Sequence, residues 1–196
     1  MITDEVYEHI VYAPHRHTYI AALPRMFERT ISTGSLSKTY AVTGWRLGYT
    51  IAPPDLTDGI RKVHDFLTIG APTPLQEAAV TALNFQADYY EQLLVEYTHR
   101  RDLFLDYLDG AGLDYTQPQG AYYVMLDISR FDFNNDTTFC YWLTEEIGVA
   151  AVPGGSFYPL NQDGMPPVTN MARVHFAKSG DVLVEAGERL LRLKDR

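Results

Sequence analysis

The longest regular pattern in the sequence is a run of helix-spaced apolar residues from Leu75 to Leu108, which ends at Gly110. Apolar side chains that recur every three to four positions predict an amphipathic helix. A single helix of this length is unusual in a globular protein, so we expect a break between Asn84 and Asp88. Because strand patterns stand on both sides of this segment, we expect two parts of an α/β protein joined by a long helix.

Short β-branched runs bounded by glycine or proline mark the expected strands. They cover residues 29–33, 46–53, 121–128, 149–153 and 172–177. Helical spacing marks further helices, which cover residues 55–67, 137–148 and 181–196. We place the boundary between the two parts near residue 105. The C-terminal part holds the elements of a complete α+β unit, whereas the N-terminal part has strands without enough partners.

The composition excludes several classes of protein. The chain has 196 residues, of which 46% are hydrophobic and 21% charged, as is ordinary for a globular protein. Its net charge of −9 argues against non-specific binding to nucleic acid, which needs a basic face. No apolar run has the length of a membrane-spanning helix. Cys140 is the only cysteine, so there is no intramolecular disulfide and no cysteine-rich zinc site. We expect a cytosolic protein without a metal, a nucleic-acid partner or a membrane partner.

The stretch from Ser32 to Tyr49, STGSLSKTYAVTGWRLGY, combines small hydroxyl residues with one lysine and one arginine. Small residues such as Ser35 suit the close approach of an oxyanion, and the guanidinium of Arg46 suits bidentate recognition of a phosphate. A lysine placed near cations and apolar groups, as Lys38 is, becomes a nucleophile. These are the parts needed to hold pyridoxal phosphate as a Schiff base. The same residues also suit an ordinary solvated turn, so both interpretations stay open at this point.

A pyridoxal cofactor also needs a carboxylate beside its pyridine nitrogen, because that charge pair keeps the ring protonated. The segment DEVY offers one, since Asp4 stands at the end of a short strand pattern formed by Ile2 and Thr3. Tyr7 follows three residues later, where a turn would return its phenol to the same site. We therefore expect Asp4 and Tyr7 to face the cofactor ring.

Five segments, DEVY, SLSKTYAVTGWRLGY, PQGAYYV, VPGGSF and ARVHFA, follow one another along the chain. In this order they resemble the class I/II pyridoxal-phosphate-dependent aminotransferases, which have the aspartate aminotransferase fold. The resemblance covers essentially the whole chain and implies an α/β fold. Residues 1–105 would be the second half of the large cofactor-binding domain, a mostly parallel sheet with helices that includes the long interdomain helix. Residues 106–196 would be the small C-terminal α+β domain.

The resemblance also implies roles for single residues. Lys38 resembles the lysine that forms the Schiff base with pyridoxal phosphate and moves the proton of the reaction. Asp4 and Tyr7 resemble the partners of the pyridine nitrogen and of the ring oxygen. The residues that resemble phosphate ligands are Ser35, Arg46 and, as a weaker candidate, Ser37.

Arg173 resembles the arginine that binds the α-carboxylate of the substrate. Its place in the sequence agrees, because Arg173 stands on an expected strand whose residues Ala172 and Val174 alternate to the other face. An arginine on a half-buried strand needs a carboxylate partner. A structural ion pair within the chain is the alternative.

The resemblance implies transamination between an L-amino acid and a 2-oxo acid, of the aspartate, aromatic, kynurenine or methionine type. Two alternatives stay open. The first is a β-elimination lyase or a synthase with the same fold and cofactor, because such enzymes share the lysine, aspartate and arginine. The second is a non-catalytic aminotransferase-like fragment or dimerisation module.

Full chains of this family are about twice as long, and the absent half normally supplies an aromatic that stacks on the cofactor ring and a phosphate-binding loop. We therefore expect the chain alone to be a fragment that is incomplete for activity. We also expect it to self-associate through its exposed sheet, or to form a homodimer, because unpaired strand edges and uncovered apolar faces attract one another.

Three other residues are candidates for packing or solvation rather than for chemistry. His15 and His17 flank an arginine on an expected loop, and we predict that they are solvated rather than bound to a metal. Cys140 stands on an amphipathic helix and is predicted to be a small buried apolar residue.

Overall fold

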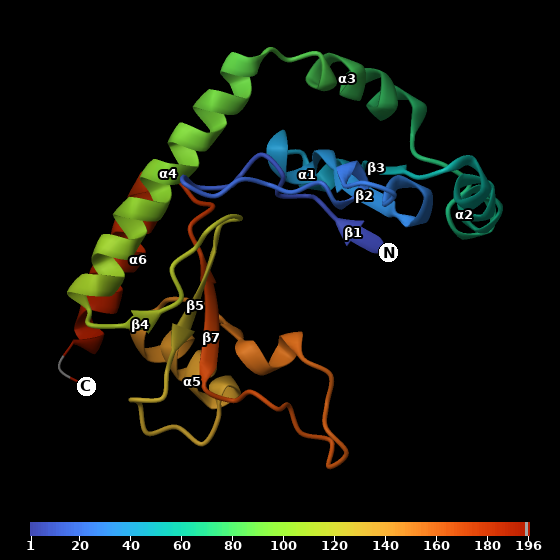
Figure 1. The fold of residues 1–196 in the computed structure, drawn as a ribbon. Coiled ribbons are helices and arrows are strands. Elements are labelled where there is room, and N and C mark those ends of the chain that lie inside the picture. The colour runs from blue at the N-terminus through green and yellow to red at the C-terminus, as the bar shows by residue number, and fades with distance from the viewer. Residues whose placement is uncertain (195) are drawn as a thin grey trace. The chain divides into compact units, whose positions relative to one another are not determined.

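The computed structural model describes residues 1–194 and 196 (Figure 1). The chain divides into two compact units, Met1–Leu94 and Val95–Arg196. This division falls within helix α4 (Ala87–Gly110), in which the boundary expected near residue 105 also lies. Strands and helices occur in both units, so the α/β class expected from the sequence is confirmed. The units are described one at a time.

The first unit contains a three-stranded sheet in the order β1-β2-β3. Its strands are β1 (Ile2–Asp4), β2 (Ile31–Ser35) and β3 (Gly48–Ile51). Strand β1 pairs with β2 in parallel, and β2 pairs with β3 antiparallel, with Gly34 opposite Tyr49. The glycine is required there, because a Cβ on Gly34 would lie 2.3 Å from the Tyr49 ring. This close approach lets the tyrosine ring lie across β2.

Helices follow the strands of the first unit. They are α1 (Leu36–Thr39), α2 (Pro54–Leu67), α3 (Thr73–Leu83) and the first turns of α4. Short 3-10 turns form at η1 (Ile20–Ala22), η2 (Phe27–Arg29) and η3 (Thr43–Trp45). The expected break in the long helical pattern is confirmed, because α3 ends at Leu83 and α4 begins at Ala87. A small core of Leu36, Leu47 and Ala79 joins α1 and α3.

The second unit contains a four-stranded antiparallel sheet in the order β4-β5-β7-β6. Its strands are β4 (Asp114–Tyr115), β5 (Tyr123–Asp127), β6 (Val152–Pro153) and β7 (Met171–His175). Val124 and Leu126 of β5 are buried, as are Ala172 and Val174 of β7. Because successive side chains of a strand point to opposite faces, Arg173 lies on the face away from this core.

Helices cover the core face of this sheet with large apolar side chains. They are α5 (Asp136–Trp142), which continues as the π-helical turn η4 (Leu143–Ile147), and α6 (Gly180–Leu190), which continues as η6 (Leu191–Leu193). The 3-10 turn η5 (Gly154–Phe157) follows β6 directly. The core is built from Phe104, Leu108, Phe139, Leu143, Phe176, Leu183 and Leu190, none more than 2% exposed. Cys140 is buried as predicted, and burial raises the pKa of its thiol to about 11.

Arginine side chains bind the carbonyl groups at the helix ends of the second unit. Arg130 donates to the carbonyl oxygens of Gly112 at 2.6 Å, Leu193 at 3.0 Å and Ala111 at 3.2 Å. Arg192 donates to Glu146 O at 2.9 Å. The last carbonyls of a helix have no partner within the helix, so these side chains satisfy them.

Candidate active site

Four of the predicted site residues lie at one edge of the three-stranded sheet. Asp4 ends β1, and Ser35 ends the parallel strand β2. Gly48, the first residue of the antiparallel strand β3, pairs with Ser35, so Arg46 precedes that strand at the same edge. Lys38 lies in α1, which begins directly after β2. The carboxyl edge of parallel strands is where open α/β sheets bind their ligands.

The carboxylate of Asp4 is exposed and oriented by its own chain. The backbone N–H of Val6 donates to Asp4 Oδ1 at 3.2 Å, which leaves Oδ2 without a hydrogen bond from any described residue. Tyr7 lies in the turn that follows, where its carbonyl accepts from the N–H of Ile10 at 2.9 Å. Asp4 can therefore offer one carboxylate oxygen to an N–H donor at the sheet edge.

Lys38 is half-buried on a helix of only four residues. So short a helix is not stable by itself, and side chains hold both of its ends. Ser35 Oγ accepts from the N–H of Ser37 at 3.1 Å and caps the start. At the other end, Thr43 Oγ1 donates to Ser37 O at 3.1 Å and the Tyr89 hydroxyl donates to Thr39 O at 2.7 Å.

The two serine hydroxyls of this turn contact each other. Ser35 Oγ lies 2.8 Å from Ser37 Oγ and 3.2 Å from the carbonyl oxygen of Leu47. Ser37 is 6% exposed, whereas Ser35 is half-buried. Of the two predicted phosphate ligands, Ser35 is the more accessible, and a phosphate role for Ser37 stays a prediction.

Arg46 is exposed and has left-handed backbone geometry, with φ 54° and ψ 42°. Its Nη1 donates to Thr43 O at 3.0 Å, and its other guanidinium donors bind no described residue. Ala41 also has a positive φ, of 55°. Non-glycine residues in this region are strained, and such strain clusters at functional sites. The loop from α1 to β3 is thus held in an unusual shape that presents a guanidinium.

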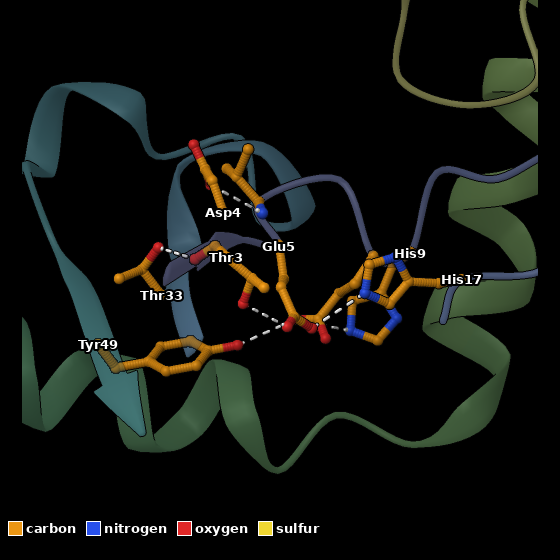
Figure 2. A network of polar contacts seen from close by, with 9 residues as sticks. Thr3, Asp4, Glu5, His9, His17, Thr33 and Tyr49 are labelled. Carbon is orange, nitrogen blue, oxygen red and sulfur yellow. Dashed lines mark hydrogen bonds and ion pairs between the residues drawn. The ribbon is translucent and has the colours of Figure 1, made fainter. Parts of the chain in front are cut away.

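A polar network anchors the segment that follows Asp4 (Figure 2). Glu5 is 7% exposed, accepts from Thr3 Oγ1 at 2.8 Å and contacts His17 Nε2 at 3.0 Å. Glu8 accepts from the Tyr49 hydroxyl at 2.9 Å. Burial alone would raise the pKa of Glu5, but the contacts with His17 and Thr3 outweigh it and hold this pKa below its usual value. His17 lies on a loop as predicted, but its half-buried side chain contacts Glu5, so the prediction that it is solvated is wrong.

Arg173, in the second unit, lies between two aromatic rings. Its Cζ is 4.2 Å from the ring centroid of Tyr123 and 4.0 Å from that of Phe157. Ala172 and Val174 alternate to the buried face as predicted. Among the described residues no carboxylate forms an ion pair with Arg173, so the alternative of an internal ion pair finds no support there.

Some residues that hold the predicted side chains are not evident from the sequence. Thr43, Tyr89 and Phe157 belong to no chemical motif, and Glu5 is the second of two neighbouring acidic residues, directly after Asp4. The one available signal is period-two alternation after β1, which separates Asp4 from Glu5. Contacts such as that of Tyr89 with α1 join residues far apart in the chain and leave no local pattern.

The sequence model of the family described as aminotransferase class I and II matches residues 1–186, so the chain belongs to this family. It is 37% identical over 193 residues to methionine aminotransferase of Escherichia coli (strain K12), and the match covers 98% of this chain and 49% of that protein. It is 36% identical over 212 residues to kynurenine–oxoglutarate transaminase of Dictyostelium discoideum, and the match covers 99% of this chain and 48% of that protein. The solved structure of N-succinyldiaminopimelate aminotransferase from Mycobacterium tuberculosis matches with a TM-score of 0.90 and 33% identity, covering 98% and 49%.

The chain spans about half the length of the curated relatives it matches, which agrees with a resemblance to the C-terminal half of the family. Members of this family use pyridoxal phosphate. Within residues 1–194 and 196, no group of three or more His, Cys, Asp or Glu side chains is arranged to hold a metal ion. None of the helices described there combines the length and the apolar character that crossing a membrane requires.

The chemistry of the donors at the sheet edge fits pyridoxal phosphate. That cofactor presents a phosphate, a pyridine nitrogen, a ring oxygen and an aldehyde. The edge presents the guanidinium of Arg46 and the hydroxyl of Ser35 for an anion, and the unbonded Oδ2 of Asp4 for a protonated nitrogen. Lys38 supplies an amine beside them.

Proposed function

We propose that the protein catalyses pyridoxal-phosphate-dependent transfer of an amino group between an L-amino acid and a 2-oxo acid. The observation that supports this most strongly is the meeting of an aspartate, a lysine, a hydroxyl and an arginine at one carboxyl edge of the sheet. Membership of the aminotransferase family supports the same reaction.

Each residue at the edge has a distinct task in this proposal. Bound pyridoxal phosphate supplies a carbonyl group for the amine and a ring that takes up the electrons of the broken Cα–H bond. Asp4 Oδ2 accepts a hydrogen bond from the pyridine N–H and keeps that nitrogen protonated. Lys38 Nζ would hold the cofactor and, once the substrate amine takes its place, would accept the proton from the substrate Cα and deliver it as general acid. Tyr7 donates its hydroxyl to the ring oxygen.

The anionic groups of cofactor and substrate are bound by the remaining residues. Arg46 and Ser35 bind the phosphate, with Ser37 as a weaker third ligand. Arg173 binds the α-carboxylate of the substrate through the N–H donors of its guanidinium, which lies over the rings of Tyr123 and Phe157. A bound carboxylate fixes the amino acid so that its Cα–H bond can be aligned for cleavage.

The test is to add pyridoxal phosphate to the full chain, reduce with borohydride and locate the tag by peptide mass spectrometry. We expect the tag on Lys38 and its loss in Lys38→Ala. The matched control is Lys62→Ala on α2, where the lysine is exposed. A tag spread over surface lysines, and unchanged by Lys38→Ala, would contradict the proposal.

We further propose that the substrates belong to the aspartate, aromatic, kynurenine or methionine type. Relatives named as methionine, kynurenine and aspartate aminotransferases, and the solved structure of an aromatic aminotransferase, support this proposal. Amino transfer from a panel of amino acids to 2-oxoglutarate, measured beside release of pyruvate and ammonia from a cysteine conjugate, separates transamination from β-elimination. We expect the chain alone to be weakly active or inactive, because it spans half of its relatives.

The exposed apolar side chains of the first unit support self-association of the chain. Phe66 is 93% exposed, Ile69 87% and Ile2 75%. Burying such residues in an interface is favourable by about 25 cal/mol per Å² of apolar surface. Sedimentation analysis should show a dimer or larger species, and a monodisperse monomer would contradict this proposal.

A further inference from the structure

The orientation of Arg173 depends on two rings that are held very differently. Tyr123 belongs to β5, which pairs with β7 over five residues, so its position is set by the sheet. Phe157 is the last residue of η5, a turn of four residues. At its end, the N–H of Tyr158 donates to Gly155 O at 3.2 Å. Contacts outside so short a turn therefore help to set the position of Phe157.

Asp136 provides one such contact. It is the first residue of α5, is 2% exposed, and its Oδ2 accepts from the buried N–H of Gly155 at 2.6 Å. Hydrogen bonds to an ionised acceptor are short and stronger than neutral ones. A carboxylate at a helix N-terminus is also favoured by the helix dipole. One buried carboxylate thus ties the start of α5 to the turn that carries Phe157.

The two glycines of η5 fit it closely against its surroundings. A Cβ on Gly154 would lie 2.6 Å from Met171 Cβ, at the start of the strand that carries Arg173. A Cβ on Gly155 would lie 2.8 Å from Val168 O and 3.0 Å from Asp136 Oδ2. Only glycine lets the backbone of the turn approach both β7 and the carboxylate.

We propose that Asp136 is a positioning residue for Arg173 and acts through Gly155 and Phe157. In this proposal the rings of Phe157 and Tyr123, 4.0 Å and 4.2 Å from Arg173 Cζ, stack on the guanidinium and leave its in-plane edge for a ligand. Such an edge favours a planar carboxylate bound by two parallel hydrogen bonds. The inference rests on the proposed role of Arg173 as the carboxylate-binding residue.

The experiment compares variants of the full chain by NMR without added cofactor or substrate. The signals followed are the Arg173 Nε–Hε resonance and the NOEs between the Phe157 ring and the Arg173 methylenes. In Asp136→Ala, the buried N–H of Gly155 loses its acceptor. We expect loss of these NOEs and a downfield shift of Hε as the ring leaves. Asn135→Ala is the matched control, since Asn135 caps the same helix by accepting from the N–H of Thr138 at 2.9 Å.

A double variant shows whether Asp136 acts through Phe157. In a Phe157→Leu background, Asp136→Ala should produce no further change in the Arg173 resonance, because the ring through which it acts is already gone. Asp136→Asn should keep part of the NOE intensity, since its amide oxygen is a weaker acceptor. If Asp136→Ala does not fold, as judged from the NOEs between β5 and β7, Asp136→Asn takes its place with partial loss of the NOE expected.

The inference is overturned if the Arg173 signals are unchanged in the folded Asp136 variant, or if Asn135→Ala changes them equally. It is also overturned if Asp136→Ala still shifts Arg173 after Phe157→Leu. These readouts do not involve Lys38 or the cofactor. Failure of borohydride tagging at Lys38 would therefore reject the proposed function and leave the role of Asp136 standing.

Discussion

Lys38 in the first unit and Arg173 in the second are held by different kinds of structure. Lys38 stands on a four-residue helix whose ends are bound by the side chains of Ser35, Thr43 and Tyr89. Arg173 stands on the interior strand β7, whose neighbouring residues are buried in a large core. Polar contacts from distant residues fix the first cation, whereas a hydrophobic core and a sheet ladder fix the strand of the second.

The two cations are held differently because buried apolar residues are distributed unequally between the two units. Of the buried apolar side chains described, the first unit contributes only Ile10, Tyr12, Leu36, Leu47 and Ala79, and the second unit contributes the rest. Hydrophobic burial is the main favourable term in folding. The first unit therefore depends more on hydrogen bonds, each of which adds only about 0.5–1.5 kcal/mol. Function in the first unit should accordingly be more sensitive to single polar substitutions.

Each unit carries one of the two tryptophans, Trp45 in the first and Trp142 in the second. In Trp142→Phe, fluorescence during denaturation reports on the first unit, and in Trp45→Phe it reports on the second. These backgrounds allow the free energy of unfolding to be measured separately for the two units.

The largest effect is expected from the core of the second unit. Phe139 is 0% exposed, and Phe139→Ala should lower the free energy of unfolding of this unit by about 3–5 kcal/mol, because it removes a buried ring and leaves a cavity. Tyr141→Ala on the same helix, where the side chain is 67% exposed, should change it by less than about 0.5 kcal/mol. If urea denaturation showed equal losses for Phe139→Ala and Tyr141→Ala, the core would not be what stabilises the second unit.

A smaller effect is expected from the buried carboxylate of the first unit. Hydrogen bonds to charged groups contribute about 1.5–3 kcal/mol, so Glu5→Gln should lower the free energy of unfolding by about this amount at pH 7. The pKa of Glu5 is lowered in the folded state from its usual 4.5. Its stabilisation is therefore present above that pH and is lost as the pH falls through the folded pKa.

The difference between wild type and Glu5→Gln should accordingly shrink between pH 5 and the acid limit of folding, by urea denaturation at a series of pH values. Glu28→Gln is the matched control in the same unit, since Glu28 is exposed. A pH-independent difference, or the same difference in Glu28→Gln, would show that the charge of Glu5 is not what stabilises this segment.

A substitution at the helix ends of the second unit should lower the free energy of unfolding by less than Glu5→Gln does. Arg130 binds three carbonyl oxygens through its planar guanidinium. Arg130→Lys keeps the charge but cannot reach all three, so we expect a loss of about 1–2 kcal/mol. Arg100→Lys, whose arginine pairs with Glu96 on the helix surface at 3.0 Å, should cost less than about 0.5 kcal/mol. A loss in Arg100→Lys as large as that in Arg130→Lys would mean that carbonyl binding is unimportant.

The sequence predicts the second unit more completely than the first. Burial in a hydrophobic core leaves a local pattern in the sequence, whereas contacts between distant residues do not. Burial alternates along β5 and β7, and this local pattern predicted both strands. In the first unit, Gly34 and Ser35 belong to β2, beyond the predicted end at Thr33, because the register with β3 places Tyr49 over Gly34. Such a register is set by residues distant in the chain and is absent from local patterns. The short strand β4 lacks a long enough run to be recognised.

The candidate site shows the same division. Residue chemistry indicated Asp4, Ser35, Lys38 and Arg46, and the sheet places all four at one edge. The side chains that hold them were not predicted, because a threonine or tyrosine that binds a carbonyl looks like any other in sequence. Thr43 and Tyr89 became visible only as hydrogen-bond donors to α1.

The smallest effect on stability should come with a distinct effect on function. Tyr89→Phe removes the hydroxyl that donates to Thr39 O and should lower the free energy of unfolding of the first unit by about 0.5–1.5 kcal/mol. Because Thr39 directly follows Lys38, fraying of this helix end should also change the reactivity of the lysine. We expect slower borohydride-trapped tagging of Lys38 by pyridoxal phosphate.

Tyr141→Phe is the control for this prediction, since it deletes an exposed hydroxyl in the second unit. If Lys38 were fixed mainly by the small core of Leu36 and Ala79, Tyr89→Phe would leave its tagging rate unchanged, while Leu36→Ala would reduce it. A slower rate in Tyr89→Phe at nearly constant stability identifies the polar contact as the element that positions the lysine. Lys38 and Arg173 would then differ in the kind of contact that orients each side chain, and not only in the stability of the unit that carries it.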